Sequence, residues 1–354
     1  MSQPSKYTGE AAWYGADLAK TDDWLLALTP THIAELEAAA EATLGRDVAT
    51  LAAEDLPLPT LDAELRKVRN DVVDGRGFAL VRGMPVDRWS KEVAARAYWA
   101  IGARVGRAVV QNPVGHVLGH VKDIGGDVDN PTQRGYQSAA NLPFHTDIGA
   151  EVVGLFCLRP AKSGGRSSIV SAATIWNEIK DRRPDLAEVL AQPFFRDRRG
   201  EEVEGQDPWY EMPVFMPAGE RMAVAYVRRF IFSCQRHADV PRLTDRQIEA
   251  MDLIDSLAYD PRLKLDMDFR PGDIQLVNNL ITLHTRTEYE DWPEPEKKRH
   301  LYRLWLTIPD GWPLPEPLYA RYGADPETGR PLGINLPAGV ARNAPLDVEA
   351  LAAE

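Results

Sequence analysis

The sequence predicts an α+β fold in which helices come first and strands dominate the rest of the chain. Helix-capping signals and helical spacing of apolar residues run through the first hundred residues. From Gly106 onward, short apolar or alternating runs lie between turn residues, which is typical of strands. A third observation places chemistry on one strand: His145 and Asp147 are two residues apart and therefore point to the same side of an extended chain.

The N-terminal part is predicted to be helical. Thr29 followed by Pro30 marks the start of a helix to about residue 44, and Gly45 fits its end. The apolar spacing of residues 61–72 predicts a second helix over 60–73, and Ser90 caps a third that reaches about residue 101. A short buried strand is expected over 78–81. We assign residues 1–75 as an N-terminal helical flank.

The remaining chain is predicted to be mostly strands, with two further helices over 172–191 and 244–258. The later helix begins with a capping box at Thr244 and Gln247. We expect residues 224–232 to form a strand leading into a loop. The other predicted strands cover 107–110, 115–124, 141–147, 151–158, 162–171, 263–269, 271–279 and 299–306.

The charge composition indicates which classes of binding partner are disfavoured. The formal net charge is −12, with 41 basic against 53 acidic residues, which disfavours binding to nucleic acid or to an anionic membrane surface. No run has the apolar core of a signal peptide or the length of a membrane span. The two cysteines, Cys157 and Cys234, are interpreted as reduced thiols. We therefore expect a cytoplasmic protein that binds a small molecule.

A metal site is the strongest functional signal. His145 and Asp147 supply two ligands, and His284, which follows the predicted strand over 271–279, supplies a third. Two histidines and one carboxylate, with other positions left open, are typical of non-haem Fe(II) oxygenases. Asp273 is a competing carboxylate, but its Pro-Gly-Asp context favours a turn. His116 and His120 share a strand face without a ligand partner at suitable spacing, so we interpret them as structural.

Arginines follow the third ligand. Arg299 and Arg303 are four residues apart, so both project from the same face of a strand. A fixed guanidinium fork suits bidentate binding of a carboxylate. Arg286 is expected to form a structural ion pair with Glu288, Glu290 or Asp291.

With these motifs, residues 70–310 resemble the taurine dioxygenase (TauD/TfdA-like) family of Fe(II)- and 2-oxoglutarate-dependent oxygenases. The motifs are His145-X-Asp147, the Gly164-Gly165-X-Ser167 segment, His284, and Arg299 with Arg303. The resemblance implies a double-stranded β-helix core (jelly-roll, cupin-like) over 76–310, a lid inserted at about 192–235, and a surface tail over 311–354, all in one domain. It also implies a homodimer or homotetramer.

The resemblance also assigns the site residues. His145, Asp147 and His284 would hold Fe(II), and Ser167 and Arg299 would bind the far carboxylate of 2-oxoglutarate, with Arg303 beside them. Arg303 would also contact substrate, unless it makes an ion pair within its strand. The other implied substrate contacts are Asn141, which could instead stabilise a turn, Gln111 and Asn112. Arg166 departs from the family, which often has an acidic residue there. No catalytic residue is expected beyond the iron ligands.

The expected reaction consumes O2 and 2-oxoglutarate, releases succinate and CO2, and hydroxylates a C–H bond of a small carboxylate or amino-acid-like molecule. The same centre could instead perform desaturation, cyclisation, or C–N or C–S cleavage. A non-catalytic small-molecule-binding barrel and, more weakly, a zinc hydrolase are the alternatives from other classes. Because Asp147 is present where related halogenases lack the carboxylate, we predict no halogenation.

Overall fold

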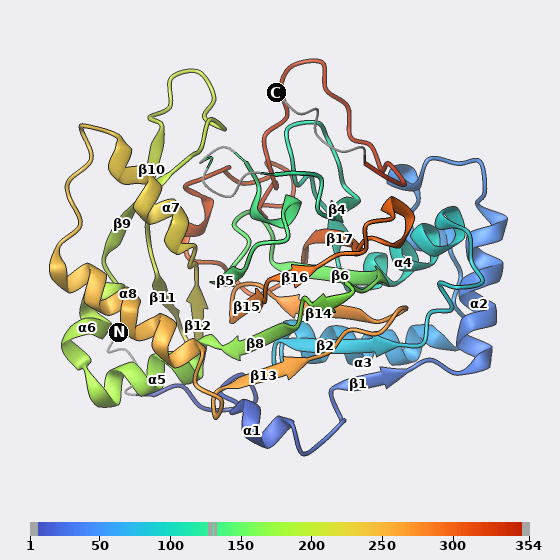
Figure 1. Ribbon diagram of the computed structural model, residues 1–354, viewed down its shortest axis with the longest axis horizontal. Helices are drawn as coiled ribbons and strands as arrows, with labels where there is room; N and C mark the ends of the chain where they lie inside the picture. The colour runs from blue at the N-terminus through green and yellow to red at the C-terminus, as the bar shows by residue number, and fades with distance from the viewer. Residues whose placement is uncertain (1–5, 127–129, 131–132, 349–354) are drawn as a thin grey trace.

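Three α-helices lie in the predicted N-terminal flank and a fourth follows it in this computed structural model, which describes residues 6–126, 130 and 133–348. They are α1 (Gly15–Leu18), α2 (Pro30–Ala42), α3 (Leu61–Val73) and α4 (Lys91–Val105). The predicted cap of α2 is present, since the Thr29 hydroxyl accepts a hydrogen bond from the His32 backbone at 3.2 Å. Likewise the Ser90 hydroxyl accepts from the Val93 backbone at the start of α4. The three longer helices gather on one side of the molecule (Figure 1).

Two facing sheets form the predicted double-stranded β-helix. The larger sheet has the order β1-β2-β14-β6-β17-β3, with β4 also beside β17. The smaller sheet has the order β13-β8-β15-β5. The strands of the larger sheet are β1 (Leu25–Ala27), β2 (Phe78–Arg82), β3 (Arg107–Ala108), β4 (Gly119–Val121), β6 (Val152–Arg159), β14 (Ile274–Asn278) and β17 (His300–Thr307). Those of the smaller sheet are β5 (Leu142–His145), β8 (Ser167–Ser171), β13 (Lys264–Met267) and β15 (Thr282–Arg286), and β7 (Ser163–Gly164) pairs with β16 (Tyr289–Glu290).

Close packing joins helix α4 to the larger sheet. The Tyr98 ring lies 5.1 Å from that of Phe156, and its hydroxyl accepts a hydrogen bond from the Leu304 backbone. A Cβ on Gly154 would lie 2.5 Å from that hydroxyl, so the approach requires glycine. Helix α4 therefore packs directly against β6 and β17, two strands that border the functional site.

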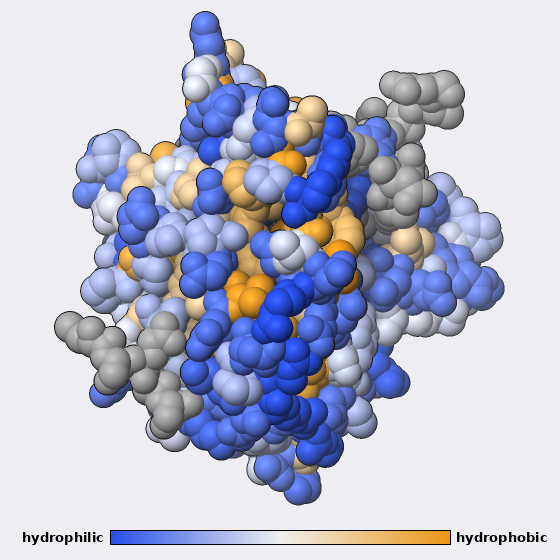
Figure 2. Space-filling model, turned by 90° about the vertical axis from the view of Figure 1, so that its left-hand side faces the viewer, coloured by the Kyte–Doolittle hydropathy of each residue, from blue (hydrophilic) through white to orange (hydrophobic). Residues whose placement is uncertain are grey.

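The segment predicted to form a lid, residues 192–235, contains two hairpins and a short helix. These elements are β9 (Pro193–Asp197), β10 (Trp209–Pro213), β11 (Phe215–Ala218), β12 (Arg221–Val224) and α7 (Arg228–Ser233). At the same end lie α5 (Ala172–Arg182), α6 (Pro184–Leu190) and α8 (Asp245–Ala258) (Figure 1). The surface here is mostly hydrophilic, and hydrophobic residues show in a hollow near the middle (Figure 2).

The predicted strand over 224–232 is wrong, because β12 ends at Val224 and α7 begins at Arg228. Aromatic and branched residues favoured a strand, but tertiary contacts override that propensity. Phe230 and Ile231 are buried, and Arg228 reaches α8, where it pairs with Asp252 and Asp255 at 2.6 Å each.

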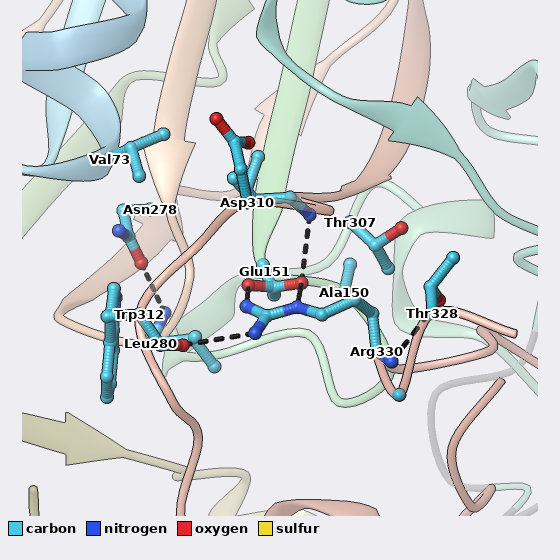
Figure 3. Close-up of polar contacts among 12 residues, drawn as sticks. Val73, Ala150, Glu151, Asn278, Leu280, Thr307, Asp310, Trp312, Thr328 and Arg330 are labelled. Atoms are coloured by element: carbon cyan, nitrogen blue, oxygen red, sulfur yellow. Dashed lines mark hydrogen bonds and ion pairs between the residues drawn. The ribbon is translucent and has the colours of Figure 1, made fainter. Parts of the chain in front are cut away.

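The tail beyond residue 310 is not only a surface segment, which corrects the prediction for 311–354 as far as residue 348; residues 349–354 lie outside the described part of the chain. Arg321, Tyr322, Arg330 and Ile334 are all buried. Figure 3 shows the ion pair that attaches this segment to the start of β6. The Arg330 guanidinium pairs with the buried Glu151 carboxylate, with Nε 3.0 Å from Oε2. Arg330 also donates to the Trp312 carbonyl at 3.0 Å. We call residues 311–334 the C-terminal strap.

Both cysteines are free and buried. Within the described parts of the chain, no helix combines the length and the apolar character needed to cross a membrane.

Candidate metal centre and cavity

Strand register brings two ligands of the predicted metal set together. In the antiparallel pairing of β15 with β5, His284 lies opposite His145, and their ring centroids are 4.3 Å apart. The chain continues from β5 to Asp147, whose Oδ1 lies 3.7 Å from His145 Nε2. Ligand atoms of all three residues lie within 4.8 Å of one another. Since metal–ligand bonds are about 2 Å long, this group is compact enough for one metal ion.

The hydrogen bonds of the two imidazoles leave nitrogen atoms for a metal. His145 Nδ1 lies 2.8 Å from the Pro143 carbonyl, which can only accept, so Nδ1 carries the proton and Nε2 keeps its lone pair. The buried Nδ1 of His284 has no hydrogen-bond partner. Burial lowers the pKa of both rings, that of His284 to about 3. Both histidines are therefore neutral, as metal binding requires.

Asp147 is held so that one carboxylate oxygen remains available. Its Oδ2 accepts hydrogen bonds from Trp305 Nε1 at 2.8 Å and from Arg303 Nη1 at 3.2 Å. Burial alone would raise the pKa of Asp147, but the charge of Arg303 and the hydrogen bond from Trp305 act in the opposite direction, and the pKa is lowered to about 2. The carboxyl is thus ionised, and Oδ1 faces the histidines.

Asn279 fixes the backbone that carries Asp147. Its Oδ1 accepts from the Asp147 amide at 2.6 Å, and its Nδ2 donates to the Asp147 carbonyl and to that of Ala150. Sequence reasoning missed both Asn279 and Trp305. The signal for Trp305 was its spacing of two from Arg303, which places it on the same strand face.

Beside the metal group, a buried guanidinium is only partly engaged. Arg299 is 4% exposed, and its Nη1 has no hydrogen-bond partner. The Tyr289 ring lies 5.1 Å from it. Ser167, also buried, directs its hydroxyl to Gln275 at 3.4 Å, and Arg299 and Ser167 line the same cavity. A buried cation with a free donor suits an incoming carboxylate.

Arg286 lies in the same cavity wall but does not make the predicted ion pair. Its Nη1 donates to the Ser138 carbonyl at 3.0 Å, and Nη2 bonds the Ala140 carbonyl. Glu290 pairs instead with Lys162, because β16 runs beside β7. The loop carbonyls before β5 therefore take the place of the predicted acidic partner.

The metal group opens into a cavity of about 480 Å³, within the usual range for small-molecule sites. Strands, lid and strap all contribute to its wall. The cavity is strongly basic: among the described residues its acidic members are Asp147 and Asp255, whereas its arginines are Arg134, Arg199, Arg228, Arg229, Arg286, Arg299, Arg303 and Arg321.

The predicted substrate contacts lie in different places. Arg303 lines the cavity, with its guanidinium 4.2 Å from the Tyr136 ring and 4.9 Å from that of Trp305. Gln111 is buried behind it and accepts from Arg303 Nε at 2.7 Å. Asn112 accepts from the His116 backbone in a turn, and Asn141 is exposed. The structure thus places Gln111, Asn112 and Asn141 outside the cavity wall.

A second group of the same composition lies elsewhere, formed by His120, His300 and Asp347. Pairing of β4 with β17 stacks the two rings, with His120 Nδ1 2.8 Å from His300 Nε2. His120 Nε2 lies 2.9 Å from the Pro345 carbonyl. This agrees with a structural role for His120, although the sequence did not reveal its partners.

Comparison with known proteins is consistent with this geometry. A family model described as "Taurine catabolism dioxygenase TauD, TfdA family" matches residues 42–305. FR-33289 synthase of Streptomyces rubellomurinus is 29% identical over 317 residues, which cover 88% of this chain and 93% of that protein. The taurine hydroxylase-like protein SAT17 of Stachybotrys chartarum is 30% identical over 324 residues, covering 88% and 82%. An asparagine oxygenase crystallised with Fe(II), hydroxyasparagine and succinate has a TM-score of 0.59 at 18% identity, covering 80% of this chain and 93% of that one.

Proposed function

Because the chain belongs to the TauD/TfdA family and is therefore a 2-oxoglutarate-dependent non-haem iron oxygenase, we propose that it hydroxylates a C–H bond of a small anionic molecule. His145, Asp147 and His284 are the proposed Fe(II) ligands. The observation that carries this proposal is the compact group of two neutral imidazoles and one ionised carboxylate that opens into an arginine-rich cavity.

The residues present fit an iron ion. The donor set is that of non-haem Fe(II) oxygenases, and the buried Nδ1 of His284 lacks a protein partner. When bound, iron supplies the oxidation chemistry, in which O2 and 2-oxoglutarate are consumed and succinate and CO2 are released. The protein's own part is to hold the ligands, exclude water and orient substrate. Trp305 and Asn279 perform the first of these tasks through Asp147.

Arg299 and Ser167 are the proposed contacts for the far carboxylate of 2-oxoglutarate. Arg299 is buried beside the metal group and keeps one guanidinium nitrogen without a partner, which a carboxylate oxygen would satisfy. The Ser167 hydroxyl, which makes a long hydrogen bond to Gln275, can turn to donate to the same group. These two contacts orient the cosubstrate toward the proposed iron ligands.

Arg303 is the proposed substrate contact nearest the iron. Its Nε and Nη1 are engaged by Gln111 and Asp147, so Nη2 remains for an anionic group, which can be cosubstrate or substrate. Gln111 would act by positioning Arg303 rather than by touching substrate. For Asn112 and Asn141, direct contact with substrate stays a prediction, as do the homo-oligomer and the cytoplasmic location.

The names of similar proteins favour hydroxylation over desaturation, cyclisation and C–N or C–S cleavage. One relative is named taurine hydroxylase-like, and the asparagine oxygenase of the same fold was crystallised with a hydroxylated amino acid. The other outcomes use the same residues, so mass spectrometry of the product separates them: hydroxylation adds one oxygen atom, and desaturation removes two hydrogen atoms.

The test is reconstitution. Fe(II) and 2-oxoglutarate added under nitrogen should give the visible charge-transfer absorption of the bound pair, and air with a panel of amino acids, sulfonates and organophosphates should stimulate succinate release. A His284→Ala variant should show neither signal. A wild-type protein that binds no Fe(II) or forms no succinate with any panel member would contradict the proposal.

A further inference from the structure

The end of the cavity formed by lid and strap carries arginines from three separate segments. Arg134 lies just before the short 3-10 helix Gly135–Gln137, Arg199 follows β9 in the lid, and Arg321 comes from the strap. All three line the cavity. Segments distant in sequence thus supply like charges to one wall, which favours an anion there.

Two of these arginines share one carboxylate. Arg321 Nη2 lies 2.8 Å from Glu201 Oε2, and Arg134 pairs with the other oxygen of Glu201. The Tyr322 hydroxyl donates to Glu201 as well. Two guanidinium charges thus meet one negative charge. Arg321 is only 2% exposed, and its buried Nε has no hydrogen-bond partner. One positive charge and at least one donor remain for a ligand.

Phe230 gathers the cationic groups around a single ring. The guanidinium carbons of Arg199 and Arg321 lie 4.7 and 4.6 Å from its centroid. Arg199 also bonds the Gln133 carbonyl, which orients its side chain. Burial and the nearby charges of Arg134, Arg229 and Arg321 lower the pKa of Arg199 to about 9. The arginine side chains are therefore held in position, and several positive charges lie close together.

The cluster is continuous with the proposed iron site. Phe230 belongs to an apolar cluster that includes Ile148, the residue after Asp147. On the other side, Tyr136 stacks with Arg303 at 4.2 Å and is two residues from Arg134. One bound molecule can thus touch Arg303 near the iron and reach the arginine cluster with its other end.

We propose that Arg134, Arg199 and Arg321 form a distal subsite for a phosphorus oxyanion, carried by the substrate as a phosphate monoester or a phosphonate. This inference rests on the proposed function, because it names the substrate class of the same cavity. A tetrahedral group presents three oxygens, so it can accept from several guanidinium groups at once, and the charge of Arg134 and Arg321 that Glu201 leaves uncompensated favours an anion there. A carboxylate offers two oxygens.

The subsite would fix regiochemistry. A substrate anchored at its phosphorus end presents to the iron only carbons at a set distance from that anchor. Specificity then depends on lid and strap residues rather than on the metal ligands.

Isothermal titration tests the subsite directly. The Fe(II) protein is saturated with 2-oxoglutarate under nitrogen, so that Arg299 is occupied, and is titrated separately with methyl phosphate, methylphosphonate and acetate. We expect both phosphorus compounds to bind at least tenfold more tightly than acetate, and the tighter of the two indicates ester or phosphonate. Arg321→Gln and Arg134→Gln should each weaken that binding at least tenfold.

Controls separate this inference from the proposed function. Arg104→Gln, which removes an arginine that pairs with Asp62 away from the cavity, should bind as the wild type does. Charge-transfer absorption should persist in every variant. Arg134 is less buried than Arg321, so Arg134→Gln carries the test if Arg321→Gln does not fold. Equal binding in wild type and Arg134→Gln, or acetate binding as tightly as methylphosphonate, would overturn the subsite. Absence of the absorption band in the wild type would instead overturn the iron site.

Discussion

Two clusters of this molecule have the same composition, two histidines and one aspartate, and the same compactness. His145, Asp147 and His284 form one, and His120, His300 and Asp347 form the other. Distance alone does not distinguish them, since the ligand atoms in each lie within 4.8 Å of one another. The clusters differ in how many of their potential metal-ligand atoms already form hydrogen bonds or ion pairs within the protein.

In the second cluster every ring nitrogen is engaged. The Pro345 carbonyl can only accept, so His120 Nε2 donates to it and His120 Nδ1 must accept from His300 Nε2. His300 Nδ1 then accepts from Arg159 at 3.4 Å. Asp347 pairs with Lys91 and Lys122. A metal would have to break these bonds.

In the first cluster, potential metal-ligand atoms remain without hydrogen bonds, and the cluster faces a cavity. Among the described residues, His145 forms a hydrogen bond through Nδ1, the buried Nδ1 of His284 has no partner, and Asp147 is held by one oxygen. Ligand atoms that have no hydrogen-bond partner therefore identify a metal site as well as the proximity of the ligands does.

The largest difference between the two clusters is expected when one histidine is removed from each and Fe(II) affinity is measured. His284→Ala should lower Fe(II) affinity by more than about 100-fold, because even loss of an outer partner costs ten- to 100-fold. Anaerobic Fe(II) titration and succinate release measure the effect. His120→Gln should leave Fe(II) affinity unchanged, and a comparable loss in that variant would show that the second cluster holds the iron.

The next largest effect is expected at the cosubstrate. Arg299→Gln should weaken 2-oxoglutarate binding by about 30-fold or more, since removing one partner of a buried charge pair costs 2 kcal/mol or more. Titration of the charge-transfer absorption gives the affinity. Arg166→Gln, an exposed arginine that pairs with Asp268, is the matched control and should show wild-type affinity.

A smaller change is expected from the outer partner of Asp147. Trp305→Phe keeps the ring but removes the hydrogen bond to Oδ2, so Fe(II) affinity should fall by about tenfold. The half-exposed Trp292 supplies the control variant Trp292→Phe. An unchanged affinity in Trp305→Phe would mean that Arg303 alone orients the carboxylate.

Acid stability should also depend on the second cluster. Burial lowers the pKa of His120 and His300 below the unfolded value of about 6.5, so the unfolded chain binds more protons than the folded one as the pH falls below that value. Their contribution is fully present above pH 6.5 and is lost on acidification, by up to about 1.4 kcal/mol per pH unit for each histidine. Urea unfolding of the iron-free protein at several pH values should show a shallower slope for His120→Gln. An identical slope would show that this pair does not titrate.

Local patterns predicted much of this molecule. Thr29 and Thr244 start helices as expected, and the alternation of a strand explains why Arg299 and Arg303 share one cavity wall. Long-range contacts could not be predicted in the same way. Arg321 lies in the cavity wall on a strap whose Arg330 pairs with the distant Glu151, and Arg286 donates to loop carbonyls in place of the expected carboxylates. No spacing in the sequence records which segments meet across the barrel.

The C-terminal strap has a consequence for biosynthesis. The proposed iron ligands all precede residue 311, so a product truncated before the strap would keep them and lose Arg321 from the cavity wall. It would also lose Arg330 and leave the buried Glu151 carboxylate without its guanidinium partner, a change that costs about 3–5 kcal/mol for a buried ion pair. Synthesis of the strap therefore both stabilises the fold and completes the cavity wall.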